Sequence, residues 1–169
     1  MKMLKKIMAV LLVSVLALTV LTGCGASFLD ENELLKMMND SVKIQSLNVT
    51  IKADSSVKSK AQAVAKIAAK AKNSAELETL LASDEVEKTL LNNDANGIYM
   101  VSYIKNQNFA SKYYQSQKEY VMLDQMADHA VYVWDETKPT PASSNTELAG
   151  FANVNLSDGA YAIVVMKIA

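Results

Sequence analysis

The spacing of apolar residues divides the chain into a helical first half and a strand-rich second half. Apolar residues recur at intervals of three and four over 31–45 and 55–72, which predicts two amphipathic helices. Asp54 stands directly before the second of these stretches, where its carboxylate can cap the helix. Ser74 and Ser83 precede two shorter leucine-rich stretches and predict two further capped helices. The stripe expected on the buried side of the second helix consists of Val57, Ala61, Val64, Ile67, Ala68 and Ala71.

The second half of the chain carries short stretches that are typical of strands. Residues 98–104 and 130–134 are rich in β-branched and aromatic side chains. Residues 151–155 and 160–168 predict a C-terminal hairpin around a turn at 156–159. The last of these strands is apolar without alternation, so we expect it to be central in a sheet and covered on both faces.

The remaining stretches predict connections. Residues 47–51 alternate and predict an extended connector, and 137–146, which contains both prolines, predicts an irregular loop. Gly97, Gly150 and Gly159 each fit a turn. Helices followed by strands, with one less regular helical segment among the strands, indicate the α+β class. We expect N-terminal helices packed on a mainly antiparallel sheet of three or four strands.

The N-terminal stretch has the pattern of an export signal. Three lysines precede an uncharged run over 7–21, and two small residues lead to the only cysteine of the chain. The exit, Leu21-Thr22-Gly23-Cys24, resembles the lipobox of bacterial lipoproteins. That resemblance implies that Cys24 receives a lipid, that the chain is cleaved before it, and that the protein is anchored on the extracytoplasmic face of a bacterial membrane. The alternative is an uncleaved membrane helix, although the run is shorter than the ~20 residues that such a helix needs.

Under the lipoprotein interpretation the chain divides into a signal peptide at 1–23, a short tether at 24–29 and one α+β domain at 30–169. All 17 basic residues are lysines, and the net charge of −1 becomes more negative once the signal lysines are removed. This balance argues against a nucleic-acid partner, because cationic side chains supply much of that affinity. With Cys24 lipidated, the domain has no thiol for a disulfide, a cysteine nucleophile or a cysteine-based zinc site.

A family resemblance adds to this reading. The stretch 34–39, Leu-Leu-Lys-Met-Met-Asn, resembles the opening helix of CAP domains, the SCP-like superfamily, and Asp54 with its following stripe resembles the family's second helix. Tyr114 and Ser116 match the aromatic residue and the serine of a later motif helix. The resemblance implies an α-β-α sandwich with a ligand-binding cavity.

The chain departs from the family at the residues that would hold a metal. CAP cavities typically gather two histidines and two acids around a divalent cation. This chain has a single histidine, His129, and Glu119 stands where the motif histidine is expected. We therefore expect no metal centre and no cofactor.

The candidate site is a possible groove of polar and aromatic side chains, namely Glu119, Asp124, Asp128, His129, Tyr114 and Ser116. His129 could act as a base or ligand with one of the nearby carboxylates, or be a strand-end histidine without chemistry. Asp124 and Asp128 would share a helix face and could pair or bind a cation weakly, or simply be exposed. Tyrosines and Trp134 could line the groove or pack in the core. The lysines of 55–72 form a solvated face or one that meets an anionic membrane.

Taken together, these patterns predict a membrane-anchored lipoprotein with a non-catalytic binding domain. Its ligand would be a lipid, a cell-wall fragment or another protein. Two alternatives remain open. One is a hydrolase-like enzyme that uses Glu119, Asp124, Asp128 and His129, whose carboxyl groups would converge in one pocket with raised pKa values. The other is an adaptor that holds a partner at the envelope through an exposed apolar patch.

Overall fold

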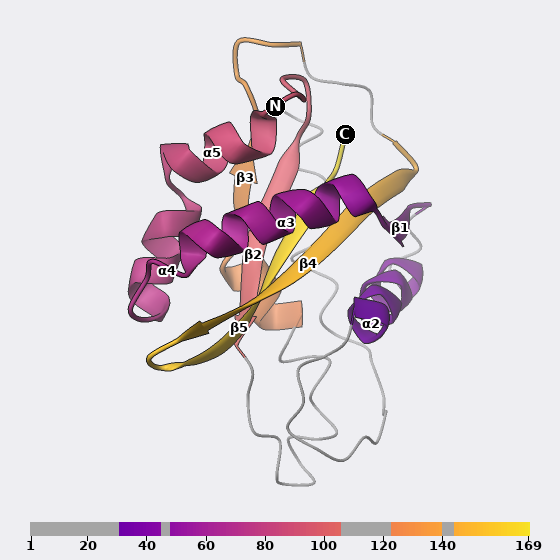
Figure 1. Cartoon of the computed structure of the whole chain (residues 1–169). Helices are drawn as coiled ribbons and strands as arrows, with labels where there is room; N and C mark the ends of the chain where they lie inside the picture. The colour runs from indigo at the N-terminus through magenta and orange to yellow at the C-terminus, as the bar shows by residue number, and fades with distance from the viewer. Residues whose placement is uncertain (1–30, 45–47, 106–122, 140–143) are drawn as a thin grey trace, which may run out of the picture.

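The computed structural model describes residues 31–44, 48–105, 123–139 and 144–169, which form helices around one five-stranded sheet (Figure 1). The strands are ordered β1-β4-β5-β2-β3. The predicted α+β class is confirmed, and the sheet is larger than the three or four strands expected. A further helical segment, at 123–128, lies between β2 and β3 in the chain. The elements are α2 (Glu31–Ile44), β1 (Thr50–Ala53), α3 (Ser55–Ala68), α4 (Ser74–Leu81), α5 (Asp84–Leu91), β2 (Tyr99–Lys105), β3 (Val131–Val133), β4 (Thr146–Leu156) and β5 (Gly159–Lys167).

The sheet is mainly antiparallel, and its one parallel pair differs from the sequence prediction. The sequence predicts an extended connector over 47–51, whereas Thr50–Ala53 pair in parallel with the first residues of β4. The same pairing makes β4 begin at Thr146, at the end of the stretch predicted as a loop. Because Thr50 and its partner Thr146 are far apart in the sequence, the local pattern carries no signal for the pairing of β1 with β4.

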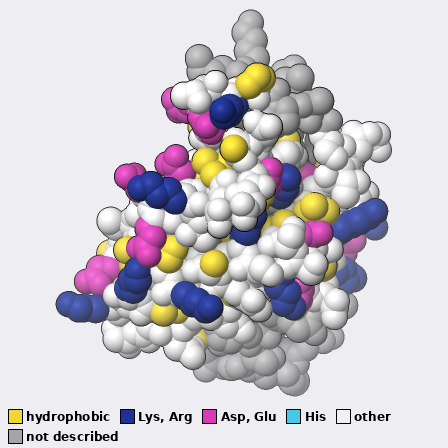
Figure 2. Space-filling model, turned by 45° about the horizontal axis from the view of Figure 1, so that its top comes forward, with side chains coloured by type: hydrophobic (Ala, Val, Ile, Leu, Met, Phe, Trp, Pro, Cys, Tyr) yellow, Lys and Arg dark blue, Asp and Glu magenta, His cyan; other side chains and the backbone are white. Residues whose placement is uncertain are grey.

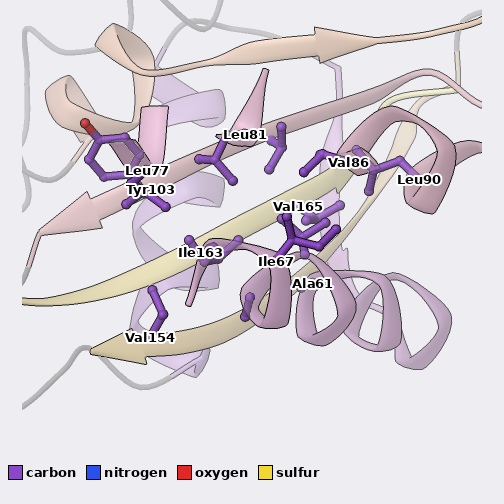
Figure 3. Close-up of a cluster of buried hydrophobic side chains, with 14 of the residues drawn as sticks. Ala61, Ile67, Leu77, Leu81, Val86, Leu90, Tyr103, Val154, Ile163 and Val165 are labelled. Atoms are coloured by element: carbon purple, nitrogen blue, oxygen red, sulfur yellow. The ribbon is translucent and has the colours of Figure 1, made fainter. Parts of the chain in front are cut away.

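Alternate residues of the central strands face two separate apolar cores. Tyr161, Ile163 and Val165 of β5 pack beneath α3, α4 and α5 (Figure 3). Val164 and Met166 face the other way, toward α2 and the 123–128 segment. β5 lies between β4 and β2, so the prediction of a central last strand covered on both faces is confirmed. Helices therefore lie on both faces of the sheet.

α3 lies across the sheet at a position set by its cap and by one glycine. Asp54 Oδ1 accepts hydrogen bonds from the backbone nitrogens of Ser56 at 2.9 Å and Val57 at 3.0 Å, which confirms the predicted cap. The predicted stripe of α3 is buried along its whole length. Gly150 lies beneath the helix within β4, where a Cβ would come 2.3 Å from the Lys58 nitrogen. Its role is this close approach, and not the turn that the sequence predicts.

The caps of α4 and α5 differ from the sequence prediction. Asn73, and not Ser74, caps α4 by accepting a hydrogen bond from the Glu76 nitrogen at 3.0 Å. The Ser74 nitrogen instead donates to Asp158 in the β4–β5 turn. Ser83 occupies the N-cap position of α5, but its hydroxyl donates to a carbonyl of α4, so α5 has no side-chain cap. Asparagine and serine cap helices almost equally well, which explains why the predicted cap of α4 was wrong by one residue.

The lysines around α3 bond largely within the chain. Lys58 lies 2.6 Å from Glu31, and Lys70 lies 2.7 Å from Glu85. Lys60 donates to two backbone carbonyls at the C-terminal end of α5. On the face shown in Figure 2, lysines and acidic side chains are interspersed rather than grouped by sign. These contacts favour a solvated helix face over one that meets an anionic membrane.

Candidate functional site

The predicted site residues fall into two groups. Glu119, Tyr114 and Ser116, like the lipidation site Cys24, lie outside the described residues. Asp124 and Asp128 belong to the helical segment at 123–128, and His129 follows it directly. The structure thus places the second group at the end of the sheet where β2 ends.

Asp124 and Asp128 lie one helical turn apart, as the sequence predicts. Asp124 is half-buried and Asp128 is exposed. Within the described ranges, no group of three or more histidine, cysteine, aspartate or glutamate side chains is arranged to hold a metal ion. Within these ranges the pair has no third carboxylate or histidine beside it to complete a cation site.

His129 contacts a different set of residues from the one that the sequence predicts. Its ring stacks on Tyr103 of β2, with ring centroids 4.3 Å apart. Its Nδ1 lies 4.0 Å from Glu78 Oε1 of α4, which is too long for a hydrogen bond. Tyr161 meets the same Tyr103 ring edge-on. Glu78 is distant in sequence, so only the folded structure shows that its carboxylate lies near His129.

This aromatic cluster contains two polar atoms that lack partners. Among the described residues, His129 Nδ1 and Tyr161 Oη are the buried side-chain nitrogen or oxygen atoms without a hydrogen bond. Burial, followed by the charge of Glu78, raises the pKa of Tyr103 to about 12. Tyr103 is therefore neutral at physiological pH, and the cluster is an apolar stack with a histidine on its outer side.

A groove lies at the edge of the sheet, between β3 and the junction of α4 and α5. Its volume is about 350 Å³. One wall consists of Leu81–Ser83 and Glu87, and the other consists of residues 131–136. Tyr132 and Trp134 are residues of the second wall, and both also pack against the core on the α2 side of the sheet. Asp124, Asp128 and His129 do not line it.

The groove is negatively charged. Glu87 and Glu136 are exposed acids on opposite walls, and Asp135 lies beside the second. Asp135 Oδ1 accepts hydrogen bonds from the Thr137 hydroxyl at 2.6 Å and the Thr137 nitrogen at 2.9 Å, which lower the pKa of Asp135. The residues that line the groove include no lysine. The sequence signal for this site is the run from Val131 to Glu136, in which an apolar and aromatic strand leads into two acids.

Glu147 of β4 is a buried carboxyl group outside the groove. Only 7% of its surface is exposed, and burial raises its pKa to about 7. A raised carboxyl pKa is one feature expected of an acid–base site, and burial alone accounts for it at Glu147. Sequence reasoning missed it because Glu147 lies between the predicted loop at 137–146 and the predicted strand at 151–155.

A polar cluster at the opposite end of β2 is bonded internally. Asp94 Oδ2 accepts hydrogen bonds from Tyr99 Oη at 2.5 Å and from Lys167 Nζ at 2.6 Å. Burial opposes ionisation of Asp94, but these two hydrogen bonds outweigh it and lower the pKa of Asp94. The three side chains bond to one another, so the cluster connects the loop before β2 to the end of β5.

Comparisons with known proteins identify no relative of the chain: no family model matches it, and neither the curated proteins nor the solved structures gave a match. The described part of the chain contains no helix that is both long and apolar enough to cross a bilayer. The fold and the groove geometry are therefore the basis for a functional assignment.

Proposed function

We propose that this chain is a lipid-anchored binding protein of the bacterial cell envelope. The sequence Leu21–Cys24 supports the lipid anchor, because it resembles a lipobox and follows a basic stretch and an apolar run. Two acyl chains on one residue are enough for stable membrane anchoring. The domain would then be held at the extracytoplasmic face by a short tether.

The observation that carries the binding function is the groove beside β3. Its volume of about 350 Å³ lies within the ~300–1,000 Å³ that small-molecule sites occupy. Trp134 and Tyr132 lie along one of its walls, and aromatic residues of this kind often contribute to the recognition of apolar and peptide ligands. A lipid, a cell-wall fragment or a protein segment could occupy such a site.

The likeness to CAP domains is part of this proposal and is supported by the roles of two residues. Asn39, the last residue of the helix motif, holds β1 against α2 through two hydrogen bonds. Asp54, which opens the family's second helix, caps α3. Helices on both faces of the sheet suit the expected sandwich. A CAP-like domain with one histidine would bind its ligand without the family's metal.

The anchor is tested by mass spectrometry of the native protein from bacterial membranes. We expect a chain that begins at Cys24 and carries acyl chains, and we expect Cys24→Ser to leave an unlipidated precursor. A native product that retains Met1 or a free thiol at Cys24 would contradict this part of the proposal.

Ligand binding is tested through Trp134, which is the only tryptophan in the chain and lines the groove. Its emission should change saturably when the correct ligand class is added to the full chain in detergent. The ligand classes to titrate are envelope lipids, soluble wall fragments and peptides. Emission that responds to none of these classes would count against a binding function for the groove.

A second candidate function is a carboxylate-based enzyme, and one observation favours it. His129 Nδ1 and Glu78 Oε1 lie 4.0 Å apart, so a small side-chain rotation would join them as an acid–base pair. Hydrolysis of a model ester or glycoside that is lost equally in Glu78→Gln and His129→Gln would support this candidate. Hydrolysis that survives both changes would exclude this pair as its catalyst.

A further inference from the structure

Within the part of the chain that the structure describes, no strand pairs with the outer edge of β3. β3 is the last strand in the sheet order, and it pairs with β2 on one side. Every second backbone N–H and C=O of an edge strand points away from the sheet, and proteins usually protect such edges with lysine or proline. The sequence from Val131 to Trp134 contains neither. β3 is three residues long and carries neither of these protecting side chains.

The groove has the shape that strand addition requires. Six consecutive residues, 131–136, form one wall, so the groove runs along β3 and the three residues that follow it. The α4–α5 junction and Glu87 form the other wall. A space bounded by an edge strand and a helix receives extended peptides in several recognition domains, where backbone hydrogen bonds give affinity and side-chain contacts give specificity.

Charge determines which strand can enter. Glu87 and Glu136 face the groove from its two walls, and Asp135 stays ionised because Thr137 donates two hydrogen bonds to it. A second copy of the chain, paired through its own β3, would bring the same three acids against them. This repulsion disfavours self-association, whereas a cationic partner would gain from the same field.

We propose that the groove binds an extended basic segment of a partner protein, which pairs with the outer edge of β3 as an added strand. This inference rests on the proposed binding function and names the partner class. Alternate side chains of a strand point to opposite faces, so one set would lie near Glu87 and the other near Trp134. The segment that fits best alternates lysine or arginine with apolar residues.

The test uses the full chain in a non-ionic detergent and a short synthetic peptide that alternates lysine and valine. Trp134 emission reports binding, because the peptide contains no tryptophan. We expect saturable binding that weakens as salt is added, and no binding of the matched peptide that carries glutamate in place of lysine.

Backbone pairing is tested with two N-methylated versions of the lysine peptide, methylated at even or at odd positions. An added strand directs every second N–H toward its partner, so one version should lose binding and the other should keep it. Equal binding of both versions would show electrostatic adsorption rather than strand addition, and would overturn the proposal.

Charge reversal within the protein provides the matched control. Glu87→Lys and Glu136→Lys should each weaken peptide binding roughly tenfold, whereas Asp128→Lys, an equally exposed acid outside the groove, should change it less than roughly twofold. Equal effects of the three changes would contradict the assignment, as would a β3-mediated dimer in sedimentation. If Trp134 responds to lipids or wall fragments and not to the peptide, the strand proposal alone fails. If it responds to none, the binding function fails as well.

Discussion

The side-chain amide of Asn39 hydrogen-bonds both backbone polar groups of Ile51. Its Nδ2 donates to the Ile51 carbonyl at 2.8 Å, and its Oδ1 accepts from the Ile51 nitrogen at 2.9 Å. The same Nδ2 also donates to Leu35 in the preceding turn of α2. One side chain of α2 thus takes the place of a neighbouring strand along β1, whose other edge pairs with β4. The edge of the sheet at β1 is closed in this way, whereas no described residue pairs with the outer edge of β3.

Replacing Asn39 should destabilise the domain through this edge. Asn39→Ala leaves the N–H and C=O of Ile51 without partners, and Ile51 is 3% exposed. We expect a loss of about 2–4 kcal/mol in the free energy of unfolding, because each unsatisfied buried group costs about 1–3 kcal/mol. Urea unfolding followed by circular dichroism measures it. Asn39→Asp should also destabilise, since a carboxylate cannot donate to the Ile51 carbonyl.

The exposed residue Asn32 of α2 provides the control for this prediction. Asn32→Ala changes the same residue type on the same helix and should alter stability by less than about 0.5 kcal/mol. If Asn39→Ala proved no more damaging than Asn32→Ala, the amide would not be what holds β1 in place.

The Asp94 cluster predicts a pH-dependent contribution to stability. Hydrogen bonds from Lys167 and Tyr99 lower the pKa of Asp94 below its ordinary value of 3.8. A lowered carboxyl pKa contributes stability above the unfolded pKa, and that contribution disappears as the pH falls through the folded pKa. Asp94→Asn should therefore cost about 1–3 kcal/mol at pH 7 and progressively less below about pH 4. Unfolding curves of the parent and the variant across this pH range measure the difference.

The sequence predicts best what is encoded locally. Asp54 and the stripe after it specify α3 within a few residues, because a cap and a helical repeat act over one or two turns. The unbroken apolar run of β5 likewise indicates a strand covered on both faces. The order and class of the elements followed from these local signals.

What the sequence does not reveal depends on contacts between distant segments. β1 becomes a strand only because β4 pairs with it on one side and Asn39 on the other. The neighbours of His129 are Tyr103 and Glu78, which come from β2 and α4, and no spacing in the chain connects them. The groove could be anticipated only in part, through Trp134, since its second wall comes from the α4–α5 junction.

Gly150 should tolerate no side chain. A Cβ at this position would come 2.3 Å from the Lys58 nitrogen and 2.5 Å from Lys58 Cα, which are backbone atoms that cannot rotate away. Gly150→Ala should push α3 off β4 and destabilise the domain by about 1–3 kcal/mol or more. Thermal unfolding measures this loss. Ala152 occupies the next position of β4 on the same face. Ala152→Gly removes a methyl group and creates no clash, so it serves as the matched control for Gly150→Ala.

Glu147 should make the domain less stable as the pH rises. Burial raises its pKa from 4.5 to about 7, so the folded state favours the protonated form. Below about pH 4.5 the carboxyl is protonated in both states and costs nothing. Between about pH 4.5 and 7 the unfolded state gains stability by ionising first, and above about pH 7 the whole penalty applies.

Glu147→Gln removes the ionisation and keeps the shape of the side chain. We expect the variant to match the parent at pH 4 and to exceed it at pH 8 by about 3 kcal/mol, because the pKa rises from 4.5 to about 7 and one unit of pKa corresponds to about 1.4 kcal/mol. Urea unfolding of the variant and the parent at the two pH values measures this difference in stability. Glu136→Gln, an exposed carboxyl in the groove, should show no comparable gain. A Glu147→Gln variant that loses stability at pH 8 would mean that the ionised carboxylate has a partner that stabilises it, and the strand would then carry a functional charge at this position.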